Sequence, residues 1–489
     1  MVGLFLPLCL LTLNYNGPFF DEGIYITAGI RTLQGFGLAD RFLTWFGGSL
    51  VWPVLAALGY RVGGLVGTRA VAAVAATTGL GAFARTVENL FGERASFWAT
   101  LAFAVNGPFL ALARLGVYDA LALSALAVAF WALTEMIRQD NRFWLGAAAV
   151  AYTLAVFAKY PIGLMIIPLA GTVLFLRDDR ATLDLVLLGF MTGALALALF
   201  LPLREQVGEF FNWRLQNRPE FGVPYSVIVF PIGYLSAAPF LLALTGWFIA
   251  QRRRWLATLM ILSLAIWPSY HLLTGDPSST NKHLVFGYLF AYPLVGLTLS
   301  TIWGDRDTGL LRKALAMLVV FTLAGLGLVQ VNQSDHSWPD VRPTAGYLIE
   351  HVQSGQDLLI NESWPYTMYL YTTGRIDTPW DVYDDYRITH EESTPPICEY
   401  DWFVDSQGSY AWPEEVLSAV EACGTFEPVF SSTSWVVNLG ADLNYVTYPV
   451  KTNVWKNTSE RHQSEQLETQ SSWNPAHTHN SLVSTLGDR

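Results

Sequence analysis

Long apolar runs dominate the chain up to about residue 331. A soluble protein of this length would instead show short stretches in which apolar and polar residues alternate periodically. The runs lie at 1–14, 63–84, 95–112, 119–137, 143–158, 161–176, 183–202, 226–250, 255–273, 284–303 and 312–331. A helix needs roughly 20 apolar residues to cross a bilayer, and most of these runs are near that length. The pattern therefore predicts a polytopic α-helical membrane protein with about eleven transmembrane helices in residues 1–331.

The pattern changes after Val331, where apolar runs shorten and Pro, Asp, Trp and Tyr become frequent. Alternating apolar and polar residues at 357–361 and 402–405 predict strands, and helical stretches stand between them. Alternation of helices and strands predicts a C-terminal α/β domain over 332–455. The polar stretch 456–489 has little apolar surface to bury, so we expect a disordered tail.

The first apolar run is short and lacks a basic flank, so it can be interpreted as a signal sequence. No small-residue cleavage pattern precedes Asp21, and we therefore expect a retained helix whose true start is missing. The loop that follows, about 15–62, contains amphipathic stretches that can lie along the membrane interface.

Composition agrees with a membrane protein, because 52% of the 489 residues are hydrophobic and only 14% are charged. Such a composition excludes an ordinary soluble globule. The net charge is −11 and the acidic residues gather in the last third of the chain. This charge distribution indicates an acidic outer domain and gives no support to a nucleic-acid partner.

The distribution of basic residues among the short loops predicts the orientation, since cytoplasmic loops carry an excess of Lys and Arg. The basic positions are Arg85, Arg94, Arg138, Arg142, Arg177, Arg180, Arg252, Arg253, Arg254, Arg306, Arg312 and Lys313. With these loops in the cytoplasm, eleven spans place the first loop, Asp119 and everything after Val331 outside.

Three cysteines occur, one in the first apolar run and two in the predicted outer domain. Cys398 and Cys423 can form a disulfide in an oxidising compartment. Two unpaired buried thiols are the alternative, because the sequence does not show whether the two Cα atoms approach.

Two adjacent carboxylates, Asp21 and Glu22, follow the first apolar run. Ionisable side chains at a membrane boundary usually serve a substrate or an ion. A carboxylate there can act as a general base or bind a hard cation. The alternative is that Asp21 simply caps the following helix, and both roles can hold together.

Further charged residues lie at the same predicted face, at the ends of other runs. Asp119 is a second acid, for which an ion pair with Arg114 is the structural alternative. Lys159, Lys282 and His283 are cations that can bind a phosphate opposite the carboxylates. Long basic side chains can also extend to the interface without any function.

The order and spacing of several short motifs over residues 1–375 resemble the GT-C superfamily of glycosyltransferases, in its protein O-mannosyltransferase and aminoarabinose-transferase branch. Besides the acidic pair, the motifs are Gly67-Thr68-Arg69-Ala70, Phe91-Gly92-Glu93-Arg94-Ala95, Ala113-Arg114 with Tyr118-Asp119, Lys159-Tyr160-Pro161-Ile162-Gly163, and Lys282-His283 followed by Tyr288 and Pro293.

The resemblance implies inverting transfer of a sugar from a polyprenyl-phosphate donor to a glycan, lipid or protein acceptor. It places the reaction at the outer face of a prokaryotic plasma membrane. Asp21 is then the base, with Glu22 and Asp119 supporting it or binding a divalent cation, Mg or Mn. The residues assigned to the donor phosphate are Lys159, Lys282, His283 and Arg114, whereas Arg69 and Glu88 are interpreted as structural.

Two other classes of protein remain open at this stage. A transporter would use acids and lysines as an ion path near the membrane midplane. Acids at the outer boundary and the lack of an internal repeat argue against it. A receptor or assembly protein would act through its outer domain, but eleven spans exceed what an anchor needs.

Overall fold

A computed structural model describes residues 2–37, 40–177, 179–216, 224–277, 279–304, 309–384, 387–388, 395–406, 412–439 and 445–459. The chain divides into two compact units. The first comprises Met1–Pro339 and Trp435–Tyr448, and the second comprises Asp340–Ser434 and the chain from Pro449 onward. The predicted tail lies outside the described residues from position 460 onward.

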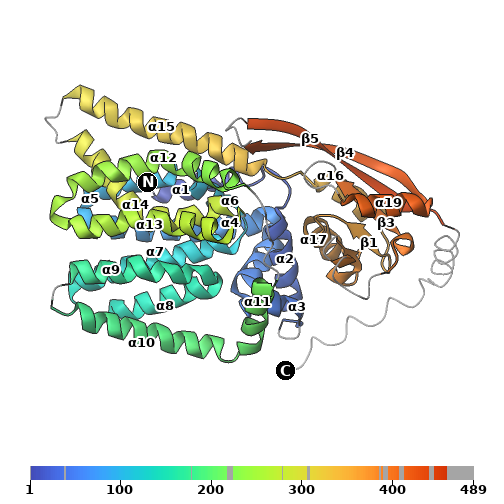
Figure 1. Cartoon of the computed structure of the whole chain (residues 1–489), viewed down its shortest axis with the longest axis horizontal. Coiled ribbons are helices and arrows are strands. Elements are labelled where there is room, and N and C mark those ends of the chain that lie inside the picture. Colours follow the sequence, from blue (N-terminus) through green and yellow to red (C-terminus); the bar gives the residue numbers. More distant parts are fainter. Residues whose placement is uncertain are drawn as a thin grey trace, which may run out of the picture. The chain divides into compact units, whose positions relative to one another are not determined.

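The first unit is mostly helical (Figure 1). Its helices are α1 (Val2–Leu10), α2 (Phe20–Leu33), α3 (Arg41–Trp45), α4 (Val51–Phe91), α5 (Glu93–Ala104), α6 (Gly107–Arg114), α7 (Tyr118–Gln139), α8 (Phe143–Ala158), η1 (Tyr160–Met165), α9 (Ile166–Leu176), α10 (Ala181–Phe200), α11 (Arg204–Gln216), α12 (Ser226–Ile249), η2 (Gln251–Arg253), α13 (Arg254–Thr274), α14 (Thr280–Trp303) and α15 (Leu310–Asp335).

Within the described residues, seven helices are long and apolar enough to cross a membrane. They are α4, α7, α10, α12, α13 with η2, α14 and α15. The pair α5 and α6, bent by 66° at its break, adds an eighth if it is counted as one span. Two of the remaining predicted segments form shorter apolar helices, α8 and η1 with α9, and the first forms α1. The structure is thus a mostly helical membrane fold, whereas a count of eleven spans stays a prediction.

Helix α4 is two helices joined at a break. Gly63 and Gly64 leave the helical conformation, and Gly64 has a φ of 59°, which favours glycine. Beyond the break the chain folds back on itself, as a hydrogen bond from the Thr68 hydroxyl to the Ala56 carbonyl (2.8 Å) shows. The predicted span at 63–84 is therefore preceded by a separate helical arm from Val51.

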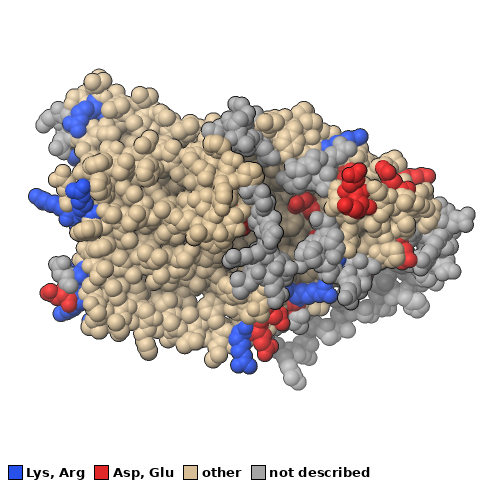
Figure 2. Space-filling view, in the orientation of Figure 1, with Lys and Arg blue, Asp and Glu red and all other residues tan. Residues whose placement is uncertain are grey.

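The sides of the helical unit expose large apolar side chains, among them Phe190, Leu241 and Phe321. In the view of Figure 2 this surface carries few charges between the ends of the helices. A hydrocarbon environment suits such a surface, since helices satisfy their backbone hydrogen bonds internally.

Lys and Arg gather at one end of the helical unit, at the left in Figure 2. Contacts between loops place their segments at a common end. Arg94 Nη1 donates to the Gly304 carbonyl (3.0 Å), and Arg253 Nη1 donates to the Leu90 carbonyl. Because α7 and α14 run toward this basic end and α8 runs away from it, their other ends carry Asp119, Lys282 and Lys159.

A five-stranded sheet of order β2-β1-β3-β5-β4 lies in the second unit, except that the parts of β4 and β5 within Trp435–Tyr448 belong to the first. Strand β1 is parallel to β2 and β3, and β3 is antiparallel to β5. The elements are α16 (Arg342–His351), β1 (Leu358–Ile360), α17 (Trp364–Thr372), η3 (Pro379–Asp381), β2 (Val382–Tyr383), η4 (Ile397–Glu399), β3 (Trp402–Ser406), α19 (Glu414–Cys423), β4 (Phe426–Leu439) and β5 (Tyr445–Asn457).

Side chains alternate between the two faces of this sheet, as the period of a strand requires. Leu358 and Ile360 of β1 pack in one apolar cluster with Leu348 of α16 and Leu370 of α17. Leu359 lies in the other cluster, which includes side chains of α19. Helices therefore cover both faces of a small mixed sheet.

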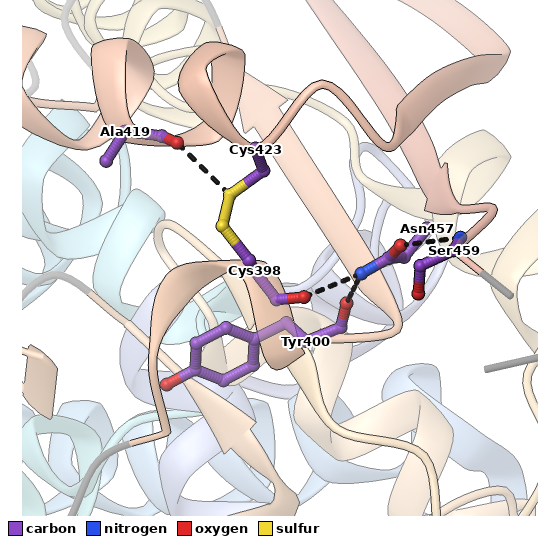
Figure 3. The surroundings of a disulfide bond; sticks show 6 residues. All are labelled: Cys398, Tyr400, Ala419, Cys423, Asn457 and Ser459. Atoms are coloured by element: carbon purple, nitrogen blue, oxygen red, sulfur yellow. Dashed lines mark hydrogen bonds between the residues drawn. A yellow bond between two sulfur atoms is a disulfide. The ribbon is translucent and has the colours of Figure 1, made fainter. Parts of the chain in front are cut away.

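A disulfide joins Cys398 and Cys423 in the second unit, so the bonded interpretation of the two cysteines is the one observed (Figure 3). Beside it, the Asn457 amide donates to the carbonyls of Cys398 (2.9 Å) and Tyr400 (3.0 Å). Asn457 is buried. Its side chain thus links the end of β5 to the segment that carries the disulfide.

Candidate functional site

Glu22 forms a buried ion pair with Arg69. Both side chains have no exposed surface. Glu22 Oε1 accepts from Arg69 Nε (2.9 Å) and from the Gly116 N–H (2.7 Å). Its Oε2 accepts from Arg69 Nη2 (2.8 Å) and from the Phe19 N–H at the start of α2 (2.8 Å). Four donors therefore occupy the two oxygens of this carboxylate.

Arg69 uses all five of its N–H groups, the full capacity of a guanidinium. Besides its bonds to Glu22, Nη1 donates to the carbonyls of Leu13 (2.9 Å) and Asn16 (3.0 Å), and Nη2 donates to the Gly17 carbonyl (2.8 Å). The interpretation of Arg69 as structural agrees with these contacts. Arg69 connects α4 to the segment between α1 and α2.

Gly116 completes this arrangement because a side chain does not fit there. A Cβ atom at position 116 would lie 2.7 Å from Thr68 Cγ2 and 2.9 Å from Glu22 Oε1. The Gly116 carbonyl also accepts from Trp52 Nε1 (3.2 Å). The loop before α7 is thereby fixed against α2 and α4.

Asp21 pairs with Lys282 across 261 positions of sequence, with 2.7 Å between Asp21 Oδ2 and Lys282 Nζ. Asp21 stands in the first turn of α2, where the helix dipole favours an anion. Its side chain is 28% exposed, whereas that of Lys282 is 9% exposed. Asp21 is therefore more open to a ligand than the buried Glu22 beside it.

Asp119 pairs with Lys159 through its Oδ1 atom. Asp119 lies in the first turn of α7, and Lys159 ends α8 with an extended backbone that leads into η1. Among the described residues, Asp119 Oδ2 has no hydrogen-bonding partner. One oxygen of this buried carboxylate is thus left unpaired.

The two carboxylate–lysine pairs lie close to each other. Lys159 interacts electrostatically with Asp21 as well as with Asp119. Lys282 likewise interacts with Asp119 in addition to Asp21. The ends of α2, α7, α8 and α14 therefore bring four of the predicted site residues into one cluster, which we call the Asp21–Asp119 cluster.

Arg114 has a different partner from the one considered from the sequence. Its Nη1 lies 2.8 Å from Asp335 Oδ2, and its Nη2 donates to the Thr12 carbonyl (2.6 Å). The suggested pair with Asp119 is therefore wrong, because Asp119 is engaged by Lys159. Asp335, the last residue of α15, was missed, although an acid at the end of the last apolar run was a usable signal.

His283 lies next to Lys282 in α14 and is buried. Its Nδ1 lies 3.0 Å from His271 Nε2, and His271 Nδ1 lies 2.6 Å from the Asp276 carbonyl oxygen. The Trp267 ring lies against the His283 ring, with centroids 4.5 Å apart. Sequence reasoning missed His271, which stands alone in an apolar run.

The three predicted metal ligands do not form a cation site. Among the described residues, no group of three or more His, Cys, Asp or Glu side chains is arranged to hold a metal. Lys282 and Lys159 occupy Asp21 and Asp119, and four N–H donors occupy Glu22. In this arrangement Glu22 has no free oxygen for Mg or Mn, whereas such a cation also takes ligands from water and from a substrate phosphate.

The sequence was compared with known protein families and with curated proteins. The dolichyl-phosphate-mannose-protein mannosyltransferase family matches residues 49–204, a stretch that includes Arg69, Asp119 and Lys159. No curated protein matches the chain significantly.

Solved structures match over nearly the whole chain. ArnT from Cupriavidus metallidurans bound to undecaprenyl phosphate is 14% identical with a TM-score of 0.57, and the match covers 93% of this chain and 97% of ArnT. The chain has the fold of the GT-C glycosyltransferases. The apo oligosaccharyltransferase of Archaeoglobus fulgidus is 12% identical with a TM-score of 0.55, covering 92% of this chain and 74% of that one.

A second structure of the archaeal oligosaccharyltransferase contains Zn and sulfate. It is 14% identical with a TM-score of 0.54, over 91% of this chain and 73% of that one. The GT-C resemblance drawn from the sequence motifs is thus confirmed at the level of the fold.

Proposed function

We propose that this chain is a glycosyltransferase that moves a sugar from a polyprenyl-phosphate donor to an acceptor hydroxyl, with inversion at the anomeric carbon. The observation that carries the proposal is the Asp21–Asp119 cluster, formed by helix ends of a GT-C fold. ArnT was solved with undecaprenyl phosphate, and the archaeal AglB with an inhibitory peptide and a dolichol phosphate. These ligands support a lipid-phosphate donor here.

The proposed reaction is a single displacement. The acceptor oxygen forms a bond to the anomeric carbon while the bond from that carbon to the phosphate oxygen breaks. The acceptor proton passes to the Asp21 carboxylate, and the lipid phosphate leaves with the bonding electrons. Asp21 suits this role because it is the more exposed of the two adjacent acids.

Lys282 and Lys159 provide the positive charge for the leaving phosphate. Fixed cations directed at a developing anion stabilise a transition state more than a ground state. When the phosphate binds, each lysine exchanges part of its contact with a carboxylate for one with phosphate oxygens. Asp21 is then freed to accept the proton.

Glu22 and Arg114 have supporting roles in this proposal. Glu22, saturated by Arg69 and two backbone N–H groups, holds the start of α2 and thereby positions Asp21. Arg114 fixes the end of α6 to the end of α15 through Asp335.

The membrane placement completes the proposal. Eleven spans put the basic loops in the cytoplasm and the Asp21–Asp119 cluster on the outer face of a prokaryotic plasma membrane. The second unit, with its disulfide, then lies outside, where disulfides persist. Acceptors of a glycan, lipid or protein class all reach this face.

The test measures release of lipid phosphate by purified protein in nanodiscs, with undecaprenyl-phosphate mannose as donor and a membrane extract as acceptor source. Asp21→Asn keeps the shape of the side chain but removes its basicity. We expect release to fall by about 100-fold or more, the usual contribution of a general base.

Asp340→Asn is the matched control, because Asp340 is a carboxylate of the second unit that pairs with Arg342. It should leave release unchanged. Near-wild-type release by the Asp21→Asn protein would remove Asp21 from the chemistry. Solute flux in sealed vesicles without any release would instead favour a transporter.

A further inference from the structure

The two buried histidines of α13 and α14 form a hydrogen-bonded chain that ends at His283, next to Lys282 of the Asp21–Asp119 cluster. The chain runs from the Asp276 carbonyl to His271 and then to His283. The two rings are stacked with their centroids 5.0 Å apart. The atoms that can donate decide the direction of each hydrogen bond in this chain.

A carbonyl oxygen can only accept, so His271 Nδ1, 2.6 Å from the Asp276 oxygen, carries the proton. In a neutral His271 the other nitrogen, Nε2, is then an acceptor. His283 Nδ1 lies 3.0 Å from that acceptor and must therefore donate. A neutral His283 consequently has its lone pair on Nε2.

Neutrality of both rings follows from their surroundings. His271 has no exposed surface and His283 is 8% exposed. The charges of Lys159 and Lys282 act on His283. Asp21 and Asp119 balance the charges of the two lysines, so a second proton on His283 would be a buried charge without an anionic partner of its own, which is costly.

We infer that His283 uses Nε2 as a hydrogen-bond acceptor for a substrate hydroxyl, and that His271 is the positioning residue that fixes this tautomer. The inference rests on the proposed function and differs in one part from the sequence-based prediction, which assigned His283 to the donor phosphate. The phosphodiester of the sugar donor carries no O–H group at neutral pH and offers only acceptor oxygens, so it cannot donate a hydrogen bond to a nitrogen that itself accepts.

Within the described residues, His283 Nε2 has no hydrogen-bonding partner of its own. A metal ion is another ligand for such a lone pair. The structure offers no group of three metal-ligating side chains among its described residues, so a hydroxyl is the better fit. A sugar supplies several hydroxyls, from the donor or from a glycan acceptor.

The first experiment tests the tautomer without any need for activity. Solid-state NMR of 15N-histidine-labelled protein in lipid distinguishes protonated from unprotonated ring nitrogens. Spectra of His271→Phe and His283→Gln proteins assign the two rings. We expect Nδ1 to be protonated and Nε2 unprotonated in both residues of the wild-type protein at neutral pH.

His271→Phe keeps the ring but removes the acceptor for His283 Nδ1. We expect this protein to show a mixture of the two His283 tautomers, together with a higher KM for the sugar donor. A wild-type His283 that carries its proton on Nε2 would overturn the inference, whatever the outcome of the transfer assay.

The second experiment separates hydroxyl from phosphate recognition with two probes. The affinity for undecaprenyl phosphate, which lacks a sugar, should stay within about two-fold in the His283→Gln protein and fall at least ten-fold in Lys282→Gln. An equal loss in both proteins would assign His283 to the phosphate and refute the inference.

The sugar source is resolved by the Nε2 resonance. A shift on adding undecaprenyl-phosphate mannose alone identifies a hydroxyl of the donor, and a shift only with membrane extract identifies the acceptor. If neither probe shifts the resonance although transfer proceeds, the hydroxyl contact is refuted while the proposed function stands.

Discussion

The guanidinium of Arg69 shows how hydrogen bonds stabilise a buried charge inside this helical unit. Its five N–H groups meet five acceptors, and its partner Glu22 meets four donors. Burial of an ion pair is tolerated when the remaining hydrogen bonds are satisfied in this way. Breaking the pair on one side leaves an uncompensated charge.

Glu22→Gln therefore tests the positioning role assigned to Glu22. Loss of the negative charge leaves Arg69 buried without its counter-ion, and a broken buried pair costs about 3–5 kcal/mol. We expect a clear fall in the thermal unfolding midpoint in detergent, followed by tryptophan fluorescence. Glu88→Gln, at the more exposed pair with Arg85, is the control and should change little.

A different carboxylate, Asp405 of β3, gives the second unit a pH dependence. Burial raises the pKa of Asp405, and its Oδ1 has no partner among the described residues. Since the folded-state pKa is the higher one, stability from this group is full below the unfolded pKa and is lost as pH rises through the folded pKa.

Asp405→Asn imitates the protonated carboxyl and should remove that loss. We expect the variant to unfold at a higher temperature than the wild type at neutral pH, with the difference shrinking as the pH is lowered toward 4. Glu350→Gln, at an exposed position, serves as the control. A difference that grows on acidification would contradict the assigned direction.

The four members of the Asp21–Asp119 cluster could be selected from the sequence because a charged side chain at the end of an apolar run is costly. They are Asp21, Asp119, Lys159 and Lys282. The pairing of these residues could not be predicted, since the Asp21–Lys282 contact joins positions 261 residues apart. His271 gave no signal, because a single histidine within an apolar run is indistinguishable from a packed core residue.

Glycines set the distances between the helices of the first unit. A Cβ atom at Gly296 of α14 would lie 2.4 Å from the Ala95 carbonyl oxygen of α5 and 2.4 Å from Ala99 Cβ. Such an approach leaves no room for a methyl group. Small residues allow close backbone contact between membrane helices.

Gly296→Ala should therefore destabilise the unit, although alanine is the better helix former by about 1 kcal/mol. Overpacking at a close contact costs about 1–3 kcal/mol. The thermal unfolding midpoint in detergent measures the balance. Gly233→Ala in α12 is the matched control, with no atom within 4 Å of the added Cβ, and it should be neutral or stabilising.

The membrane helices were predicted well where the length and apolarity of a segment alone determine that it is helical. Each of the eleven apolar segments contains helix. The break within the run at 95–112 was not predicted, although its cause is local. The run divides into α5 and α6 where the Asn106 side chain accepts from the Phe109 N–H (3.1 Å) and starts a new helix.

Charge is distributed unequally between the two ends of the helical unit, with the basic residues at one end (Figure 2). The carboxylate–lysine pairs lie at the other ends of the same helices. This asymmetry is what the positive-inside rule needs to fix an orientation. It predicts opposite accessibility for the two ends in a cell.

Single cysteines test that prediction in intact cells with a membrane-impermeant maleimide. Asn332→Cys, near the end of α15, should be labelled directly, and Arg252→Cys only after permeabilisation. Both positions are exposed. The wild-type chain is the background control, because Cys9 is buried and the other two cysteines are bonded. The opposite labelling pattern would invert the proposed orientation.

The order in which Arg69 meets its partners has a consequence for biosynthesis. All five of its acceptors belong to Leu13, Asn16, Gly17 and Glu22, which leave the ribosome before Arg69 does. The arginine can thus be neutralised during membrane insertion, long before α14 exists. Ribosome-stalled chains ending near residue 110 should integrate into the membrane, and less efficiently once Glu22 is replaced by Gln.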